Sequence, residues 1–188
     1  MTRAPLPALL PFLRDNAAFL SAGTLLTFAS SFGQTFFISV FAGEIREAFE
    51  LSHGAWGSIY AAGTFASAVM MIWAGQATDI LRVRALCLIV LPFFAAACLA
   101  MAAASAAWML VPVVFALRFA GQGMTSHIAT VAMARWFVAT RGRALSVASM
   151  GFAIGEAVLP LTFVALMTVV DWRWLWVLCA GLLLALLP

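Results

Sequence analysis

Two charged residues, Arg118 and Glu156, lie deep inside apolar stretches of a chain whose other charges fall between such stretches. A charged side chain in a lipid bilayer is costly unless it faces a partner or a water-filled cavity. An arginine at such a depth can bind an anionic group, and a carboxylate can bind and release a proton. We therefore expect both residues to belong to a substrate or coupling-ion site, provided that these stretches cross a membrane.

The composition is that of an integral membrane protein. Of 188 residues, 65% are hydrophobic and 9% are charged, and the mean hydropathy is +1.09, whereas soluble domains are about 25% charged. The net charge of +3 comes from arginines scattered over short polar segments, so nucleic-acid binding is not expected. Cys87, Cys98 and Cys179 lie in apolar runs without the spacing of a disulfide framework or a metal site, and we expect no metal and no cofactor.

Six long apolar stretches predict six transmembrane helices, since about 20 apolar residues are enough for one crossing. Seven arginines fall on the side of the amino terminus and two on the opposite side, which places both termini in the cytoplasm by the positive-inside rule. An alanine-rich chain whose basic residues are all arginine indicates a bacterial source, and hence the inner membrane. Residues 1–16 are expected to be a cytoplasmic segment, and the helices to span about 17–42, 54–78, 84–104, 107–134, 142–168 and 172–188.

The sequence contains a weak internal repeat. At an offset of 88 residues, Gly33-Gln34 aligns with Gly121-Gln122, and Gly63 aligns with Gly151. Helices one to three thus correspond to helices four to six. Because three is an odd number of crossings, such a repeat must be inverted in the membrane. The predicted fold is an all-α membrane protein with six transmembrane helices as two inverted three-helix repeats.

Polar residues in two of the predicted helices recur at helical spacing. On a regular α-helix Arg118, Gln122 and Thr125 lie within about 40° of one another, which predicts a polar stripe facing a cavity. In the first helix Thr27, Ser30 and Gln34 share one face by the same spacing. Such residues can line a substrate site, or they can hydrogen-bond neighbouring helices.

The fifth predicted helix carries residues with separate expected roles. Gly151 and Gly155 form a ridge of small residues suited to close helix packing, and Pro160 can kink the helix. Glu156 lies about 100° around the helix from Gly155, so it need not face the same neighbour. It can serve in proton coupling or as a fixed partner of Arg118, and the sequence leaves these two roles open.

Two motifs carry a resemblance to a known family. The segment from Gly75 through Asp79 to Arg82 and Arg84 resembles the cytoplasmic loop motif of the major facilitator superfamily, although Arg82 stands where that motif has a glycine. The run Arg118-Phe-Ala-Gly121-Gln-Gly123 is similar to the superfamily's intramembrane arginine followed by a pair of glycines. The segments from Arg141 to Arg143 and from Asp171 to Trp174 look like those of monocarboxylate and oxalate/formate-type members.

The resemblance implies the amino-terminal six-helix half of a twelve-helix secondary transporter that works by alternating access. It implies a small-molecule substrate, with an organic anion as one candidate, and proton-coupled symport or antiport. Gly75, Asp79, Arg82 and Arg84 would then act in a cytoplasmic gate. The chain would need a second six-helix half or a homodimer partner, because it has the look of an incomplete carrier.

The alternative is a non-transporting six-helix scaffold or sensory module, which would need no polar cavity at mid-depth. An enzyme is not expected, because the sequence has no recognisable nucleophile, metal-ligand set or nucleotide-binding loop.

Overall fold

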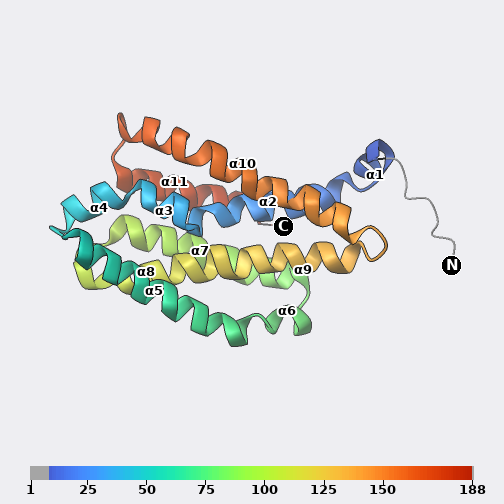
Figure 1. Ribbon diagram of the computed structural model, residues 1–188, viewed down its shortest axis with the longest axis horizontal. Coiled ribbons are helices and arrows are strands. Elements are labelled where there is room, and N and C mark those ends of the chain that lie inside the picture. The colour runs from blue at the N-terminus through green and yellow to red at the C-terminus, as the bar shows by residue number, and fades with distance from the viewer. Residues whose placement is uncertain (1–8, 188) are drawn as a thin grey trace.

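A computed structural model describes residues 9–187, and this part of the chain contains helices and no strand. The helices run beside one another in an elongated bundle (Figure 1). The long unbroken ones lie over predicted spans two, three and five, and a shorter one begins the sixth. They are α5 (His53–Ala74), α7 (Val83–Ala103), α10 (Arg141–Met167) and α11 (Trp172–Ala185).

The first predicted span is not one regular helix. It consists of α2 (Ala17–Ser30), the 3₁₀ turn η1 (Ser31–Gly33) and α3 (Thr35–Val40), and it is followed by α4 (Ala42–Ala48). Gln34 has an extended backbone, with φ −84° and ψ 156°, so the helix stops there and restarts. The expectation of an uninterrupted helix over 17–42 was wrong, because hydropathy does not report a single extended residue.

The fourth predicted span changes its helical type midway. It comprises the 3₁₀ turn η2 (Ala107–Met109), α8 (Leu110–Leu117), a π-helix η3 (Arg118–Thr125) and α9 (Ser126–Trp136). π-Helical segments are rare and often mark functional sites. Two short helices, α1 (Leu9–Asp15) and α6 (Ala77–Ile80), lie in segments for which the sequence indicated no element.

Four helical stretches are long and apolar enough to cross a membrane: 53–80, 83–103, 107–136 and 141–167. Two further apolar stretches, Ala17–Gly33 and Trp172–Ala185, are shorter. Four crossings are therefore supported by length and composition. The predicted total of six crossings stays a prediction.

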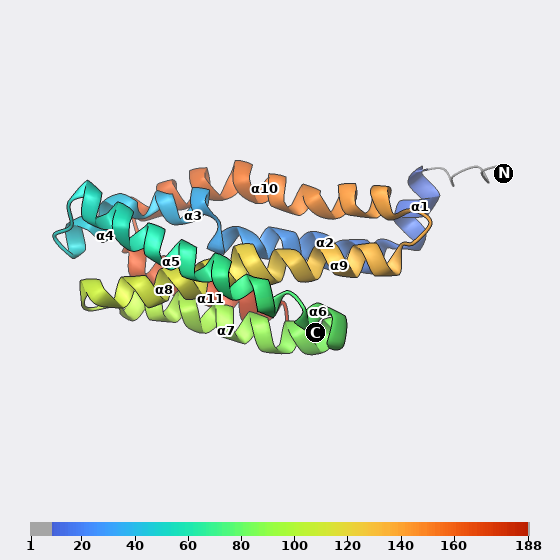
Figure 2. The ribbon, with the colours of Figure 1, turned by 60° about the horizontal axis from the view of Figure 1, so that its bottom comes forward.

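The bundle is held together by a few long helix pairings. α2 packs along α10, α5 packs along α8, and α7 packs along α11, while α2 also contacts α9. Figure 2 shows α10 along one side of the bundle and α7 along the opposite side. The two interrupted stretches, from α2 to α3 and from α8 to α9, pack on each other between these sides.

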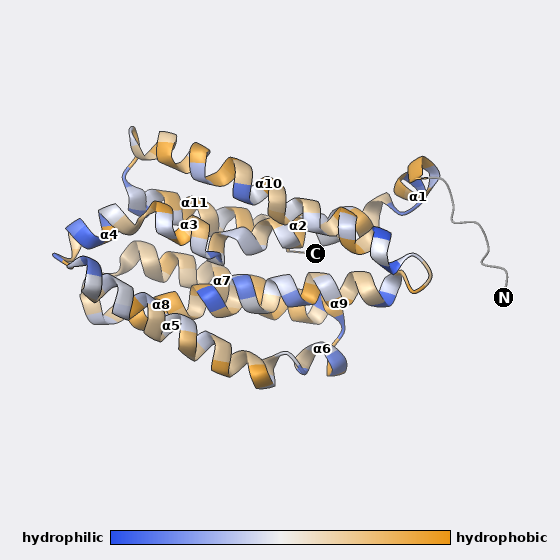
Figure 3. Ribbon diagram, in the orientation of Figure 1, coloured by the Kyte–Doolittle hydropathy of each residue, from blue (hydrophilic) through white to orange (hydrophobic). Residues whose placement is uncertain are grey.

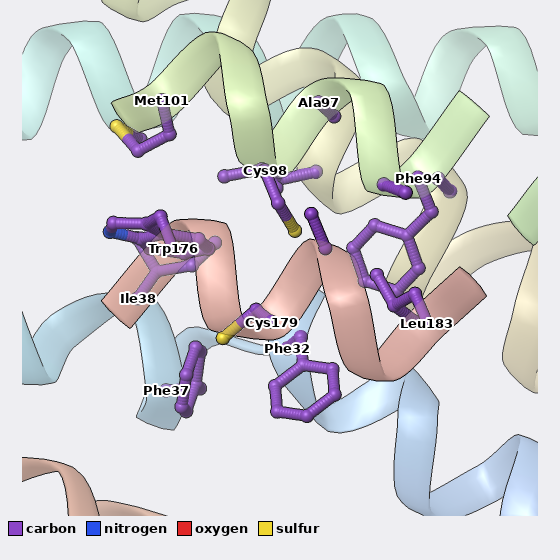
Figure 4. Close-up of a cluster of buried hydrophobic side chains, with 14 of the residues drawn as sticks. Phe32, Phe37, Ile38, Phe94, Ala97, Cys98, Met101, Trp176, Cys179 and Leu183 are labelled. Carbon is purple, nitrogen blue, oxygen red and sulfur yellow. The ribbon is translucent and has the colours of Figure 1, made fainter. Parts of the chain in front are cut away.

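An aromatic cluster fixes the position of α3 after the break. The Phe37 ring lies 4.8 Å from that of Phe163 in α10 and 5.6 Å from that of Trp176 in α11, both centroid distances with edge contacts. Figure 4 shows Phe37 and Trp176, with Cys98 and Cys179 among the buried side chains around them. Such contacts each add about 0.5–1.5 kcal/mol beyond the area they bury. The restarted helix is therefore held from two sides.

Polar contacts fix several helix ends. Ser52 accepts a hydrogen bond from the Ala55 amide and caps α5. Asn16 does not cap α2, and its side-chain amide instead donates back to the Phe12 carbonyl. The Arg173 guanidinium donates to the carbonyls of Ala102 and Ala104 at 2.7 Å and so ties the start of α11 to the end of α7.

The two ends of the bundle differ in charge. One end, which we call the arginine-rich end, holds the connections from α5 to α7 and from α9 to α10 (Figure 1). The opposite end holds the connections from α4 to α5 and from α10 to α11. The arginines of the first end are Arg14, Arg82, Arg84, Arg135, Arg141 and Arg143, and the acidic residues of the other are Glu44, Glu47, Glu50 and Asp171.

Candidate functional site at a helix crossing

Gly33 and Gly121 meet where the broken first stretch crosses the π-helix. A Cβ atom built on Gly121 would lie 2.6 Å from the Gly33 Cα, and one built on Gly33 would lie 2.8 Å from the Gly121 Cα. Real Cβ atoms do not approach other atoms so closely. The two backbones are thus in direct contact, and any side chain at either position would push them apart.

The break in the first stretch gives Arg118 its hydrogen-bond partner. Regular helical bonding resumes only with the Ile38 amide donating to the Gln34 carbonyl, so the Gly33 carbonyl is left for another donor. Arg118 Nη1 donates to this oxygen at 3.2 Å. Irregular backbone inside a membrane is tolerated only where its polar groups are satisfied. Arg118 therefore completes the bonding of the broken helix.

The rest of the Arg118 side chain is poorly compensated. Its exposed fraction is 6%, and its guanidinium carbon lies 5.7 Å from the centre of the Tyr60 ring. Within residues 9–187 no carboxylate lies within 4.0 Å of the guanidinium, and its Nε is buried without a hydrogen-bond partner. The Tyr60 hydroxyl is bonded at 3.0 Å to Thr35, just beyond the break. The site thus presents a buried positive charge that lacks an anion.

The predicted stripe in the fourth span is not continuous. Arg118 and Thr125 are buried, whereas Gln122 is exposed. The π-helix has more residues per turn than an α-helix, so the α-helical spacing used to align the three residues does not hold. Thr125 donates to the carbonyl of Ala120, five residues earlier, at 2.7 Å and uses its hydroxyl inside the segment.

The three polar residues predicted to share one face of the first span also differ in their surroundings. Thr27 donates across the helix pair to the Ala148 carbonyl of α10 and joins the two helices. Ser30 is fully buried and donates within its own helix to the Thr27 carbonyl at 2.7 Å. Gln34 is half-buried and lies at the break. Of the three residues, only Gln34 keeps a partly open position.

Glu156 does not meet Arg118. It is exposed on α10, one turn beyond Phe152, whose ring lies 5.7 Å from that of Phe36 in α3. No ion pair joins Glu156 to any residue of the described chain. Figure 3 shows hydrophilic segments midway along α10 and along the α8–α9 stretch, among otherwise apolar ribbon. The two charged residues within apolar stretches therefore differ in position: Arg118 is buried inside the bundle, and Glu156 is exposed on its surface.

The small residues of α10 pack on α2 and on the 3₁₀ turn η1 that follows it. A Cβ built on Gly151 would collide with the Thr24 carbonyl, and one built on Gly155 would collide with the Ser31 hydroxyl. α10 continues as a helix through Pro160 to Met167. In the fourth stretch, a Cβ on Gly123 would meet the flexible side chain of Met71, so Gly123 permits a looser approach than Gly121 does.

The predicted gate motif is bound to the end of α9. Arg135 donates to the Thr78 carbonyl and, at 2.8 Å, to the Asp79 carboxylate. The Thr78 hydroxyl lies 3.3 Å from His127 Nε2, and this ring nitrogen would also lie 3.6 Å from a Cβ on Gly75. Arg82 and Arg84 are exposed. The α5–α7 connection is therefore latched to the fourth stretch through Arg135.

A family model described as the Major Facilitator Superfamily matches residues 23–188, which include the whole crossing and the gate motif. The chain belongs to the Major Facilitator Superfamily. Among curated proteins none matches the sequence. Membership implies a membrane transporter, and together with the apolar helices it identifies a multi-pass membrane protein. The resemblance is confirmed at the level of the superfamily, and the likeness to monocarboxylate or oxalate/formate-type members stays a prediction.

Some residues of this superfamily member's site were not anticipated from its sequence. Tyr60 was missed, although it is the single tyrosine of the chain and lies in an apolar stretch. Nothing in the sequence distinguishes Arg135 from the other arginines between the apolar stretches, since its contact with Asp79 depends on the position of α6 against α9. Within residues 9–187 no group of three or more His, Cys, Asp or Glu side chains gathers as a metal site would require.

Proposed function

We propose that this chain forms one six-helix half of a secondary transporter that moves a small solute by alternating access. The short apolar stretches Ala17–Gly33 and Trp172–Ala185 would be the first and sixth crossings, the first of them extended by α3. The arginine-rich end would face the cytoplasm, together with both termini, by the positive-inside rule. A second six-helix half, or a second copy of this chain, would close the transport path.

An inverted repeat agrees with the helix pairings. Exchanging helices one to three with helices four to six converts the α2–α10 pair into the α8–α5 pair, and both pairs are extensive. Gly63 packs on the backbone of α8, and Gly151, its equivalent at the 88-residue offset, packs on the backbone of α2. Gly33 and Gly121 are equivalent to each other and touch. These contacts are those expected of a pseudo-twofold axis running between the two glycines.

The substrate we propose is an organic anion, and the observation that carries this proposal is the uncompensated charge of Arg118. A buried cation is stable only with a partner, and here it has one carbonyl and the face of one aromatic ring. A carboxylate approaching the unpartnered Nε would supply the missing charge through a charge-assisted hydrogen bond. Gln34 and Gln122, at the edge of the crossing, would add neutral hydrogen-bonding groups.

Glu156 would have a different task from Arg118. Because it is exposed on α10 and has no ion-pair partner in the described chain, it is free to bind a proton when the second half covers this face. We propose that Glu156 is the coupling carboxylate and that Asp79, held by Arg135, belongs to the cytoplasmic gate. Arg82, Arg84 and Gly75 complete that gate in this proposal.

Binding measurements on matched solutes test the anion proposal. The purified chain is heated with small carboxylates and with the corresponding neutral amides, and its unfolding temperature is recorded. Carboxylates should stabilise the wild type and amides should not. Arg118→Lys should reduce the effect, because the compact ammonium of lysine lacks the planar guanidinium fork that can bond Gly33 through one nitrogen and a carboxylate through another. Equal stabilisation by acids and amides would contradict the proposal.

The scaffold alternative has one observation in its favour. Arg118 and Ser30 lie in dry helix contacts, as purely structural residues would. Flux measurements in proteoliposomes separate the two functions, because a scaffold would carry no solute under any gradient. Co-reconstitution with a chain that supplies the second half belongs to the same experiment.

A further inference from the structure

A cavity lies at the arginine-rich end, away from the helix crossing. Its volume is about 440 Å³, and residues of α2, of α7 and at the end of α9 line it together with Leu186. The walls are mainly apolar, with Leu25 and Leu26 on one side and Cys87 on another. None of its lining residues belongs to the crossing or is a partner of Arg118.

The residues that line this cavity include one arginine and one tryptophan. Arg84, in the first turn of α7, is exposed and has no ion-pair partner among residues 9–187. Trp136, the last residue of α9, is 41% exposed, and its ring lies 5.0 Å from that of Phe19. Tryptophan and arginine side by side are typical of the level of lipid headgroups. An apolar cavity whose lining includes both has the polarity of one phospholipid molecule.

The start of α7 adds a second group suited to an anion. The side chain of Arg82, at the N-cap position, makes no capping hydrogen bond, so the first amides of this 21-residue helix have no side-chain partner. Helix starts carry a partial positive charge that attracts phosphate. The Arg84 side chain and these amides lie at the same end of the same helix. Both favour a negatively charged headgroup over a zwitterionic one.

We propose that this cavity is a binding site for one anionic phospholipid. Its acyl chain lies along Leu25, Leu26 and Cys87, and its phosphate is bound by Arg84 beside the indole of Trp136. The occupant is a lipid rather than a protein segment, because the cavity combines an apolar interior with a cationic group and an interfacial aromatic residue. The site does not depend on the proposed transport function and can exist in either functional alternative.

Two arginines of the same connection provide a matched pair for the test. Arg84 lines the cavity and Arg82 does not, although both are exposed and only two residues apart. The protein is purified from vesicles of phosphatidylglycerol and phosphatidylcholine, and the retained lipids are counted by native mass spectrometry. Arg84→Gln should lower the preference for phosphatidylglycerol about fivefold, the effect expected for one basic residue in contact with the headgroup. Arg82→Gln should leave it within about twofold of wild type, because its charge lies outside the cavity and is screened by salt.

The apolar part is tested by filling it. Leu25→Trp puts a large side chain into the cavity, whereas Ile89→Trp adds the same group at an exposed position of α7 that does not line it. Only Leu25→Trp should expel the retained lipid. In the wild type, phosphatidylglycerol with a photoreactive acyl chain should label the peptides containing Leu26 and Cys87. Labelling elsewhere, or equal effects of Arg82→Gln and Arg84→Gln, would overturn the proposal even if a tryptophan variant failed to fold.

Discussion

Arg118 Nη1 donates to the carbonyl of Gly33 at 3.2 Å, across 85 residues of sequence. This contact joins the two irregular segments of the bundle, the break at Gln34 and the π-helix that begins at Arg118. It assigns Arg118 two tasks, the bonding of an open carbonyl and the presentation of a positive charge. Substitutions that separate these tasks are the most informative ones.

Replacing Arg118 with lysine or glutamine should separate structure from binding. Lysine keeps the charge and can still donate to Gly33, so we expect a small change in thermal stability and at least about tenfold weaker anion binding. Glutamine should lower both the thermal stability and the affinity for the anion, because it removes the charge and its shorter side chain does not extend as far towards the Gly33 carbonyl. Thermal unfolding and equilibrium binding of a small carboxylate measure the two effects. Unchanged binding by both variants would remove Arg118 from the substrate site.

Replacing Gly33 or Gly121 with alanine should force the crossing apart. An added methyl group would collide with backbone, which cannot move aside as a side chain can, and we expect a loss of about 1–3 kcal/mol in unfolding free energy. Gly57 in α5 and Gly181 in α11 have open space around a built Cβ. Alanine at these control positions should be neutral or stabilising. Chemical unfolding in detergent compares the four variants.

Replacing Arg135 with glutamine should release the α5–α7 connection from α9. The ion pair with Asp79 is exposed, with side chains 44% and 74% accessible, so its loss should cost only about 0.2–1 kcal/mol. The local effect should be larger, because the bond to the Thr78 carbonyl is lost as well. Hydrogen exchange of residues 75–82 should rise. Arg82→Gln, which breaks no contact within the described chain, serves as the control and should leave exchange there unchanged.

Replacing Glu156 with glutamine should spare the fold and impair coupling. The side chain is exposed and makes no ion pair in the described chain, so the unfolding temperature should stay the same. In a complete carrier, uptake driven by a proton gradient should fall while exchange of substrate without a gradient persists. Ser149→Ala, on an exposed position of the same helix, is the matched control. Full gradient-driven uptake by Glu156→Gln would exclude this carboxylate from coupling.

Much of the helical framework could be predicted because hydropathy and helix stop signals are local. The apolar stretches gave the approximate position of each long helix, and the Arg118-Phe-Ala-Gly121 run led to the superfamily that the family model confirms. The polar stripes could not be predicted in the same way. Predicting which polar residues share a face requires a uniform α-helical rotation per residue. The break at Gln34 and the π-helix that begins at Arg118 change that rotation.

Composition and short motifs are enough to identify a helical membrane protein of the transporter superfamily, since both are properties of neighbouring residues. Which groups meet depends on the tertiary structure. It brought Gly33 against Gly121, gave Arg118 a carbonyl in place of Glu156, and bound Asp79 to Arg135. The rotation and depth of each helix are set by packing between segments far apart in the chain, and packing of that kind leaves no local signal.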